Sequence, residues 1–305
     1  MFSDISKQLI LYWQEYFPDQ EAPSSLYPLF ARGDKWNMLF IFSDKSLKPK
    51  CAIEIAHGRN ELLRSSANNL RDLNKNLQLA PFCPQFIYFG CLGSDDMFIQ
   101  EACDGTPLLF LLQQKLGGVS SKKHYIGIAT DLLIKLHSLS ISKYIFLDSN
   151  TLGDFFGSLL ALSKDNGSIR GIVSSIKNKR LPLVLSHNDF IPANILINKN
   201  ELKILDWEYA NFEGLPLTDL CNFLLWAYRD ISRREVPPEG FIKDVFFSNC
   251  YLGDAVKKSI KSYCQALVID KNLALAIFLQ WLLAEFKDDK LVESLISKPL
   301  ECFNI

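Results

Sequence analysis

The chain has 305 residues, of which 48% are hydrophobic and 22% are charged, and its formal net charge is -1. This composition is typical of a folded globular protein rather than a disordered or fibrous one. The balanced charge argues against the clustered basic face that nucleic-acid binding requires. The length favours one large domain or two lobes, and two lobes with a cleft between them are the working expectation.

The cysteines and the apolar segments bear on cellular location. Eight cysteines are scattered along the chain without a CxxC pair or a zinc-like Cys/His spacing, so we expect reduced and mostly buried thiols. The N-terminus contains Asp4 and too short an apolar run for a signal peptide. Residues 273–286 are apolar but contain Gln280, which predicts a buried helix rather than a membrane span. We expect a cytoplasmic protein without a membrane partner, whose oligomeric state the sequence leaves open.

The first hundred residues predict a small sheet that carries one helix. The runs LYPLF, NMLFIF, CAIEIA and FIYFG have the length and composition of strands, and ELLRSSANNLRDLNKNL has a helical pattern. The segment from Glu101 to Pro107 passes from a strand through Asp-Gly into a helix that begins at Pro. We therefore expect a first lobe at residues 1–101, a hinge at 102–107 and a second lobe at 108–305.

The second lobe is predicted to be mainly helical, which makes the fold class α+β. Apolar residues between Tyr125 and Leu136 recur on one helical face, and Ser120 or Ser121 can cap that helix. Similar apolar stripes occur at residues 220–227 and 256–267, and residues 233–240 form the clearest surface loop.

The stretch HNDFIPANILINKNELKILDWE, residues 187–208, contains a predicted hairpin. The apolar triplets 195–197 and 203–205 flank a polar segment that is short enough for a hairpin loop. Counting the pairs places Asn194 opposite Asp206, and directly opposed residues have Cβ atoms about 4.5 to 5.5 Å apart. An amide oxygen and a carboxylate at that separation can share one hard cation such as Mg²⁺.

A second carboxylate, Asp189, precedes Asn194 by five residues, with Pro192 stiffening the loop between them. Beside a bound phosphate it could accept a hydroxyl proton and orient that hydroxyl for in-line attack. His187 is expected to pack behind the loop and to hold its turn. Taken singly, these are ordinary turn residues, Asp206 is an ordinary helix cap, and His187 is an ordinary buried histidine. Their order and spacing favour a joint site.

The set of His187, Asp189, Asn194 and Asp206 resembles the HxDxxxxN…D signature of protein-kinase-like phosphotransferases, in the branch of aminoglycoside phosphotransferases and choline kinases. The resemblance implies a two-lobed protein-kinase-like fold whose first lobe binds ATP and whose second lobe carries the catalytic loop and the substrate site. By resemblance, Asp189 is the catalytic base, and Asn194 and Asp206 hold Mg²⁺. The acceptor is a small molecule with a hydroxyl group, and ATP is not distinguished from GTP.

Three further segments resemble the same family. LIKLHSL, which contains His137, is similar to the helix that ends in Leu-His before the catalytic loop. LPLTDL, which contains Asp219, resembles the segment whose Asp braces that loop, although both residues can equally be structural. FIQEACDGTPL resembles the hinge, which implies that the backbones of Glu101 and Cys103 bond the adenine edge, with Gln100 at the back of its pocket.

The family pattern breaks in the third strand of the first lobe. That strand normally carries a Lys that pairs with the nucleotide phosphates and with a Glu on the neighbouring helix. Aligning CAIEIA puts Ala52 against adenine but Glu54 in the place of the Lys, and Ser66 in the place of the helix Glu. A carboxylate about 4 Å from a phosphate costs on the order of 4 kcal/mol at a protein surface. This departure makes a pseudokinase the alternative to an active kinase.

Other cations of the first lobe can substitute for the missing Lys. Lys35 lies near Gly33, which marks a turn over the phosphates, but it is equally well explained as a solvated turn residue. Arg64 or Arg71 on the helix is a third possibility. Bringing Lys50 into place would shift the strand by about 13 Å and break its apolar register.

The acceptor is the least determined part of the prediction. The residues that can frame a cationic head group are Glu208, Tyr209, Trp226 and Tyr228. Trp226 also falls among apolar helical residues, where core packing is its expected role. The residues Arg229, Arg233 and Arg234 instead favour a phosphorylated or acidic sugar, or form a solvated face. An amino-alcohol, a sugar and an aminoglycoside all remain open.

Overall fold

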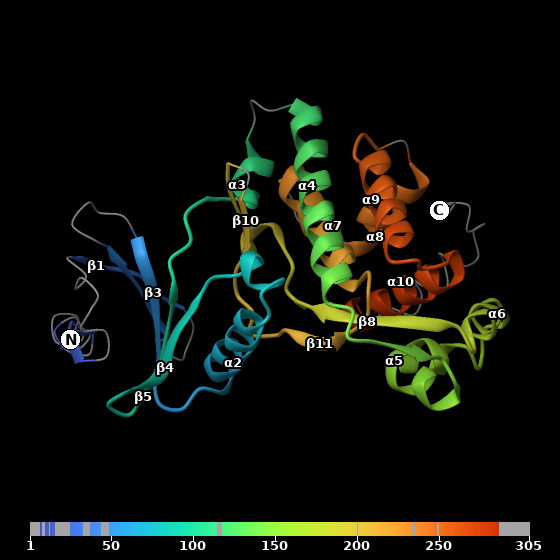
Figure 1. Cartoon of the computed structure of the whole chain (residues 1–305). Helices are drawn as coiled ribbons and strands as arrows, with labels where there is room; N and C mark the ends of the chain where they lie inside the picture. Colours follow the sequence, from blue (N-terminus) through green and yellow to red (C-terminus); the bar gives the residue numbers. More distant parts are fainter. Residues whose placement is uncertain are drawn as a thin grey trace. The chain divides into compact units, whose positions relative to one another are not determined.

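The computed structural model describes residues 7, 10–11, 13–15, 25–32, 37–43, 49–114, 118–199, 201–233, 236–248 and 250–286 (Figure 1). The chain divides into two compact units, one of Met1–Thr106 with Leu196–Tyr209 and one of Pro107–Ile195 with Ala210–Ile305. The segment Leu196–Tyr209 therefore groups with the first unit, whereas the sequence assigned all residues after 107 to the second lobe.

The first unit is built on a five-stranded antiparallel sheet with the strand order β1-β2-β3-β5-β4. Its strands are β1 (Ser25–Arg32), β2 (Asn37–Ser43), β3 (Pro49–Ala56), β4 (Phe86–Leu92) and β5 (Asp95–Glu101). The other elements are α2 (Glu61–Lys75), the turn η1 (Ala80–Phe82), and the small sheet formed by β10 (Glu201–Ile204), β9 (Ile195–Asn198) and β6 (Thr106–Pro107).

The core of the first unit follows from the alternation of side chains along β3. Cys51, Ile53 and Ile55 are buried on one face, where they pack in one cluster with Trp13 and two residues of β5. Residues 52 and 54, which alternate with them, are only half-buried on the other face. The expected pairing of Ala52 and Glu54 on one face is therefore present.

Helix α2 packs against β4 and β5. Its N-cap is Asn60, whose side chain accepts a hydrogen bond of 3.0 Å from the amide of Leu63. The residues that α2 buries share one helical face; they are Leu63, Ala67, Leu70 and Leu73.

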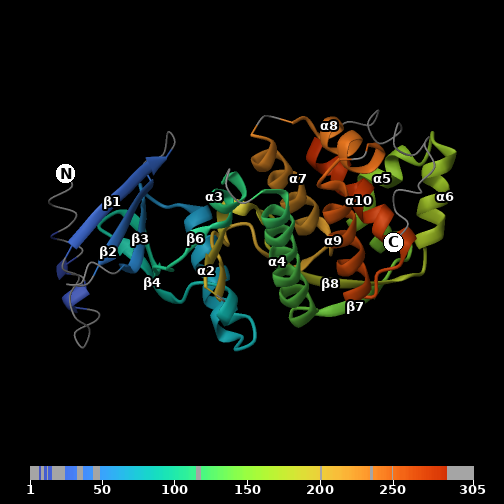
Figure 2. The ribbon, with the colours of Figure 1, turned by 90° about the horizontal axis from the view of Figure 1, so that it is seen from above.

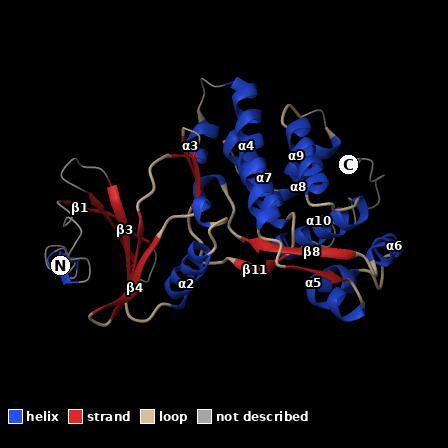
Figure 3. Cartoon of the chain, viewed as in Figure 1, coloured by secondary structure: helices blue, strands red, loops and turns tan. Residues whose placement is uncertain are grey.

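The second unit is mainly helical (Figure 3). Its helices are α3 (Leu108–Gln113), α4 (Gly118–Leu139), α5 (Ser149–Leu162), α6 (Gly167–Ile176), α7 (Thr218–Ser232), α8 (Pro238–Ile242), α9 (Gly253–Ala266) and α10 (Lys271–Phe286). Two shorter turns are η2 (Pro192–Asn194) and the π-helical η3 (Lys243–Phe247). Helix α4 packs against α7 and α9, and α7 packs against α10, so these helices form one group (Figure 2).

The second unit also contains a sheet that the sequence did not predict. Strands β7 (Lys143–Phe146), β8 (Arg180–Ser186) and β11 (Asn211–Gly214) form it in the order β11-β8-β7. All residues of β8 after Arg180 are buried, so the strand is a continuous apolar run rather than an alternating one. This strand ends at Ser186, and it therefore fixes the position of His187 and the loop that follows.

The last helix, α10, and the cysteines were both expected to be mostly buried. Helix α10 spans the predicted buried segment, and its residues Leu273–Leu279 are buried. Across the part of the chain that is described, no helix is both long and apolar enough to cross a membrane. The described cysteines are free thiols, of which Cys91 is exposed.

Candidate active site

The loop that follows β8 brings Asp189 and Asn194 together. The side-chain amide of Asn194 donates to the carboxylate Oδ2 of Asp189 at 2.8 Å and to its backbone oxygen at 3.0 Å. Burial raises the pKa of the half-buried Asp189, while the hydrogen bond from Asn194 and the nearby His187 oppose that rise. The result is a carboxylate with a fixed orientation and a raised proton affinity.

The orientation of Asn194 also bears on metal binding. Its NH₂ group is committed to Asp189, so its amide oxygen is the atom left to accept from, or coordinate, another group. A neutral amide oxygen is a suitable ligand for Mg²⁺, which takes only one or two carboxylates and completes its shell with water and phosphate. Within the described parts of the chain, no cluster of three or more His, Cys, Asp or Glu residues has metal-binding geometry. The amide oxygen of Asn194 therefore fits a cation that takes its remaining ligands from water and phosphate.

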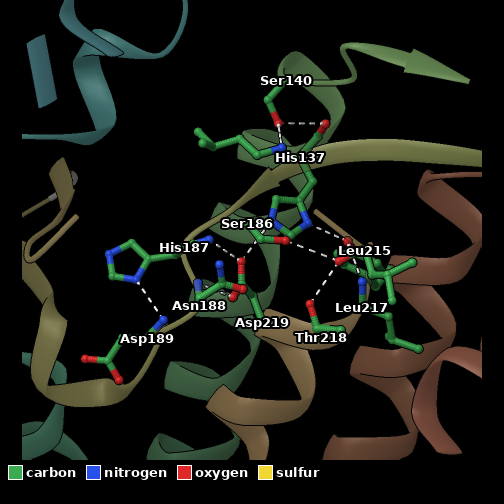
Figure 4. A network of polar contacts seen from close by, with 12 residues as sticks. His137, Ser140, Ser186, His187, Asn188, Asp189, Leu215, Leu217, Thr218 and Asp219 are labelled. Carbon is green, nitrogen blue, oxygen red and sulfur yellow. Dashed lines mark hydrogen bonds and ion pairs between the residues drawn. The ribbon is translucent and has the colours of Figure 1, made fainter. Parts of the chain in front are cut away.

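Asp219 holds the start of this loop. It is fully buried in the first turn of α7, and its carboxylate accepts the amide of His187 at 2.7 Å and that of Asn188 at 2.9 Å (Figure 4). Asn188 has a φ of 63° and Leu217, just before α7, a φ of 71°. Such left-handed backbone in non-glycine residues costs about 1 to 3 kcal/mol each and persists only where the surroundings enforce it.

Two side chains from other helices complete the brace. The hydroxyl of Tyr263, on α9, accepts the amide of Leu217 at 3.0 Å and also bonds Nδ1 of His137, on α4. Nδ1 and the hydroxyl share one proton between them, and the other ring nitrogen of His137, Nε2, faces Asp219. That atom is 3.4 Å from the Asp219 carboxylate, which is too long for a well-formed hydrogen bond and makes the contact mainly electrostatic.

The surroundings of Asp219 keep it ionised. Burial alone would raise its pKa, but His137, His187 and the amide of His187 outweigh burial and hold the pKa below its usual value. His187 is itself fully buried, and its Nδ1 accepts the amide of Asp189 at 3.3 Å. The two histidines and Asp219 thus form one buried support beneath the loop of Asp189.

Sequence reasoning missed Tyr263 as part of this support. The residue lies on the apolar stripe of α9, where an aromatic side chain is normally a packing residue, so the pattern gave no signal of its hydroxyl contacts.

In the first unit, three carboxylates lie near one another. Burial, followed by the charges of Asp206 and Glu208, raises the pKa of Glu54 to about 7. Asp206 has a φ of 65°, which is again left-handed backbone in a non-glycine residue. The two predicted metal ligands thus fall in different units, with Asp206 in the first and Asn194 in the second.

Helix α2 contacts the segment that contains Asp206 through two polar side chains. Ser65 donates to the backbone oxygen of Glu208 at 2.9 Å, and Asn69 donates to that of Trp207 at 2.8 Å. Ser66 was expected to stand at the family's helix Glu position, but the serine that contacts this segment lies one residue earlier.

The hairpin itself is tighter than predicted. Its strands, β9 and β10, are separated by residues 199 and 200 only, and Lys199 has a φ of 54° as a two-residue connection commonly requires. Lys203 on β10 donates to the backbone oxygen of Cys83 at 2.9 Å and lies 3.6 Å from the carboxylate of Glu101. These contacts tie the hairpin to the hinge.

The backbone amides of the hinge differ in whether they have a backbone partner among the described residues. The amide of Glu101 donates to Gln85 and that of Ala102 to Lys50, at 2.9 and 3.1 Å. None of the backbone hydrogen bonds found between described residues uses the amide of Cys103. A pocket of about 370 Å³ beside the hinge is lined by residues that include Glu101, Cys103 and Lys50.

The two arginines of α2 that could replace the missing Lys contact the sheet of the first unit. Arg64 lies 3.8 Å from the buried carboxylate of Asp96 and over the ring of Phe89, while Arg71 lies over Phe86. Both arginines are therefore engaged by the sheet of their own unit, which weakens them as phosphate ligands. Gly33 and Lys35 lie outside the described residues.

The predicted acceptor residues separate into different environments. Trp226 is 39% exposed, so the expectation that it packs in the core was wrong. Tyr228 is buried against Phe241, and its hydroxyl bonds Asp244 at 2.5 Å, so it does not frame a ligand. Glu208 and Tyr209 belong to the first unit, and Arg234 lies outside the described residues.

The fold resembles that of protein-kinase-like phosphotransferases of known structure. The crystal structure of an aminoglycoside-3'-phosphotransferase of type VIII, at 13% identity, covers 86% of this chain and 93% of its own with a TM-score of 0.50. A choline/ethanolamine kinase family protein from Mesorhizobium loti, at 14% identity, covers 100% and 96% with a TM-score of 0.45. A choline kinase from Cryptosporidium parvum, at 16% identity, covers 97% and 95% with a TM-score of 0.46.

A family match adds the more specific assignment. The family described as choline/ethanolamine kinase matches residues 137–297, which is more than half of the chain. A search of the curated proteins finds no significant match. The chain belongs to the choline/ethanolamine kinase family, whose members are kinases that phosphorylate hydroxyl groups.

Proposed function

We propose that the chain transfers the γ-phosphate of ATP to a hydroxyl group of a small molecule, with Asp189 as the base. The observation that supports this most strongly is the pairing of Asp189 with Asn194 on a loop that Asp219 holds by two amides. An oriented carboxylate of raised pKa is suited to accept the acceptor's proton as the hydroxyl attacks. In-line transfer needs mainly positioning and charge neutralisation, so a rigid loop contributes directly to rate.

Asn194 and Asp206 are the proposed Mg²⁺ ligands, and the bound ion would neutralise phosphate charge during transfer. The free amide oxygen of Asn194 and the left-handed backbone of Asp206 support this assignment. The backbones of Glu101 and Cys103 are proposed to bond adenine, with Ala52 beside the ring, and Lys35 near Gly33 stays a prediction for phosphate binding. His137 and His187 act as structural supports.

A pseudokinase is the second candidate, and Glu54 is the observation that favours it. An ionised carboxylate at the position of the family's Lys would repel the nucleotide phosphates. Because the pKa of Glu54 is about 7, however, a large fraction of the side chain is neutral at neutral pH, which reduces this repulsion. The active kinase is therefore the function that the site supports better.

Two measurements separate the candidates. Thermal unfolding with MgATP, compared with ATP plus EDTA, reports nucleotide binding, because a ligand of the folded state alone raises its stability. ADP release across amino-alcohols, sugars and aminoglycosides reports turnover. Stabilisation by MgATP with acceptor-dependent ADP release supports the kinase. Stabilisation without any turnover supports the pseudokinase. A chain that shows neither stabilisation nor turnover would exclude both candidates.

A further inference from the structure

A large pocket lies on the face of α7 that carries Trp226 and two arginines. It has a volume of about 980 Å³, which is within the range of small-molecule sites. Its charged and aromatic lining comes from one face of α7, through Trp226, Arg229 and Asp230, and from Arg233, the left-handed residue that ends the helix. Gln113 at the end of α3 and residues 236–237 complete it.

The pocket belongs to the same unit as the catalytic loop and shares elements with it. Helix α3, which contributes Gln113, packs against both α7 and the turn η2 that contains Asn194. Helix α7 carries Asp219 in its first turn and the pocket residues in its last turns. A molecule bound here would thus rest on the two helices that support the loop.

The two guanidinium groups retain hydrogen-bonding capacity. Arg229 donates through Nε to the backbone oxygen of Val236 at 3.0 Å, and Arg233 donates through one terminal nitrogen to the backbone oxygen of Gln113. These contacts fix the two side chains and use one nitrogen of each guanidinium. The other N–H groups can donate to a bound molecule. None of the ion pairs found between described residues involves Arg229 or Arg233.

Among the described residues of the lining, Asp230 is the one carboxylate beside the two arginines. Burial raises the pKa of Asp230 to about 6, and the one opposing contact comes from the side chain of Gln113. A carboxylate paired with a guanidinium would have a lowered pKa instead. The described lining, with two arginines and one carboxylate, therefore carries more positive than negative charge at neutral pH.

The same arrangement is unsuited to a cationic head group. Recognition of a quaternary ammonium requires an open aromatic face and nearby negative charge. Here the guanidinium carbon of Arg229 lies 5.0 Å from the ring centre of Trp226, so a cation of the protein itself already occupies that face. A bound choline would meet this charge at close range.

From the two arginines that line the pocket, we infer that the pocket binds a small molecule through an anionic group, a carboxylate or a phosphate. Planar guanidinium groups bind both anions through paired hydrogen bonds. The inference is independent of the proposed function, because it concerns binding at this pocket and not phosphoryl transfer.

The test is calorimetric titration of the full chain, with and without MgADP, using matched anionic and neutral probes. Galacturonate is compared with galactose, glycerol phosphate with glycerol, and choline serves as the cation. We expect at least one of the two anionic probes to bind at least about 10-fold more tightly than its neutral partner. The pair that responds tells whether carboxylate or phosphate is preferred.

Variants assign the binding to the pocket. Arg229→Gln and Arg233→Gln should each weaken the anionic probe by about 10-fold to 100-fold, since each removes a charge-assisted contact. Arg229→Lys should recover only part of the loss, because an ammonium lacks the planar fork. Arg170→Gln is the matched control, since Arg170 is an exposed arginine that also donates to backbone oxygens but lies outside the pocket.

Anionic probes that bind no better than their neutral partners, tighter binding of choline, or arginine variants that bind like the control would each overturn the inference. Because the titration needs no turnover, its outcome is separable from that of the proposed function. An inactive chain that binds galacturonate would refute the kinase alone, and an active chain that binds no anionic probe would refute this inference alone.

Discussion

Replacing Tyr263 with Phe tests the buried support of the catalytic loop. The substitution keeps the ring but removes the hydroxyl that accepts the amide of Leu217 and bonds Nδ1 of His137. Both partners are buried, and each polar group left unsatisfied costs about 1 to 3 kcal/mol. We therefore expect Tyr263→Phe to lower the free energy of unfolding by about 2 to 5 kcal/mol.

The assay is urea unfolding followed by tryptophan fluorescence, with steady-state kinetics on the folded variant. Without their hydrogen bonds to the hydroxyl, Leu217 and His137 should hold Asp219 and the loop of Asp189 less firmly. We therefore expect kcat to fall by a larger factor than the KM for ATP changes. Tyr144→Phe is the control, because Tyr144 is 44% exposed and its ring contact with Arg180 does not need the hydroxyl. If Tyr263→Phe costs no more than this control, the hydroxyl does not support the loop.

Two further predictions concern the hinge and the pocket. Gly105→Ala should destabilise by about 1 to 3 kcal/mol in thermal unfolding, because Gly105 has a φ of 151° and a Cβ would lie 3.1 Å from the backbone oxygen of Ile197. Gly127→Ala, in open space on α4, should instead be neutral or slightly stabilising, and equal losses in both variants would contradict the reasoning. Asp230 has a raised pKa, so its contribution to stability is full below about pH 4 and is lost as the pH rises through about 6. Asp230→Asn should therefore be more stable than the wild type by about 1 to 3 kcal/mol at pH 8 and equal to it at pH 4, and a difference that does not change with pH would refute this.

The sequence predicted the elements that have a clear apolar period. Helices α4, α7 and α9 carry stripes of apolar residues, and the strands of the first unit are bounded by turn residues. The sheet of β7, β8 and β11 was not predicted, because β8 is buried on both faces and so has no alternation. A short continuous apolar run cannot be assigned to strand or helix by periodicity alone.

The sequence predicted only those contacts of the site that join residues close together in the chain. Asp189 and Asn194 are five residues apart, so their order and spacing already indicated that they meet. The contacts of Tyr263 with Leu217 and His137 join distant segments, and no spacing encodes them. Trp226 was assigned to the core because it lies among apolar residues, but its side chain faces the pocket beside Arg229.

The most direct test of the central claim is acceptor-dependent release of ADP by the wild type and by Asp189→Asn at saturating MgATP. General-base catalysis contributes roughly 100-fold to 10,000-fold, so kcat should fall by about that factor while the KM for ATP changes little. Asp165→Asn, an exposed aspartate of the same unit, should behave like the wild type. A wild type that turns over an acceptor no faster than Asp189→Asn would contradict the account.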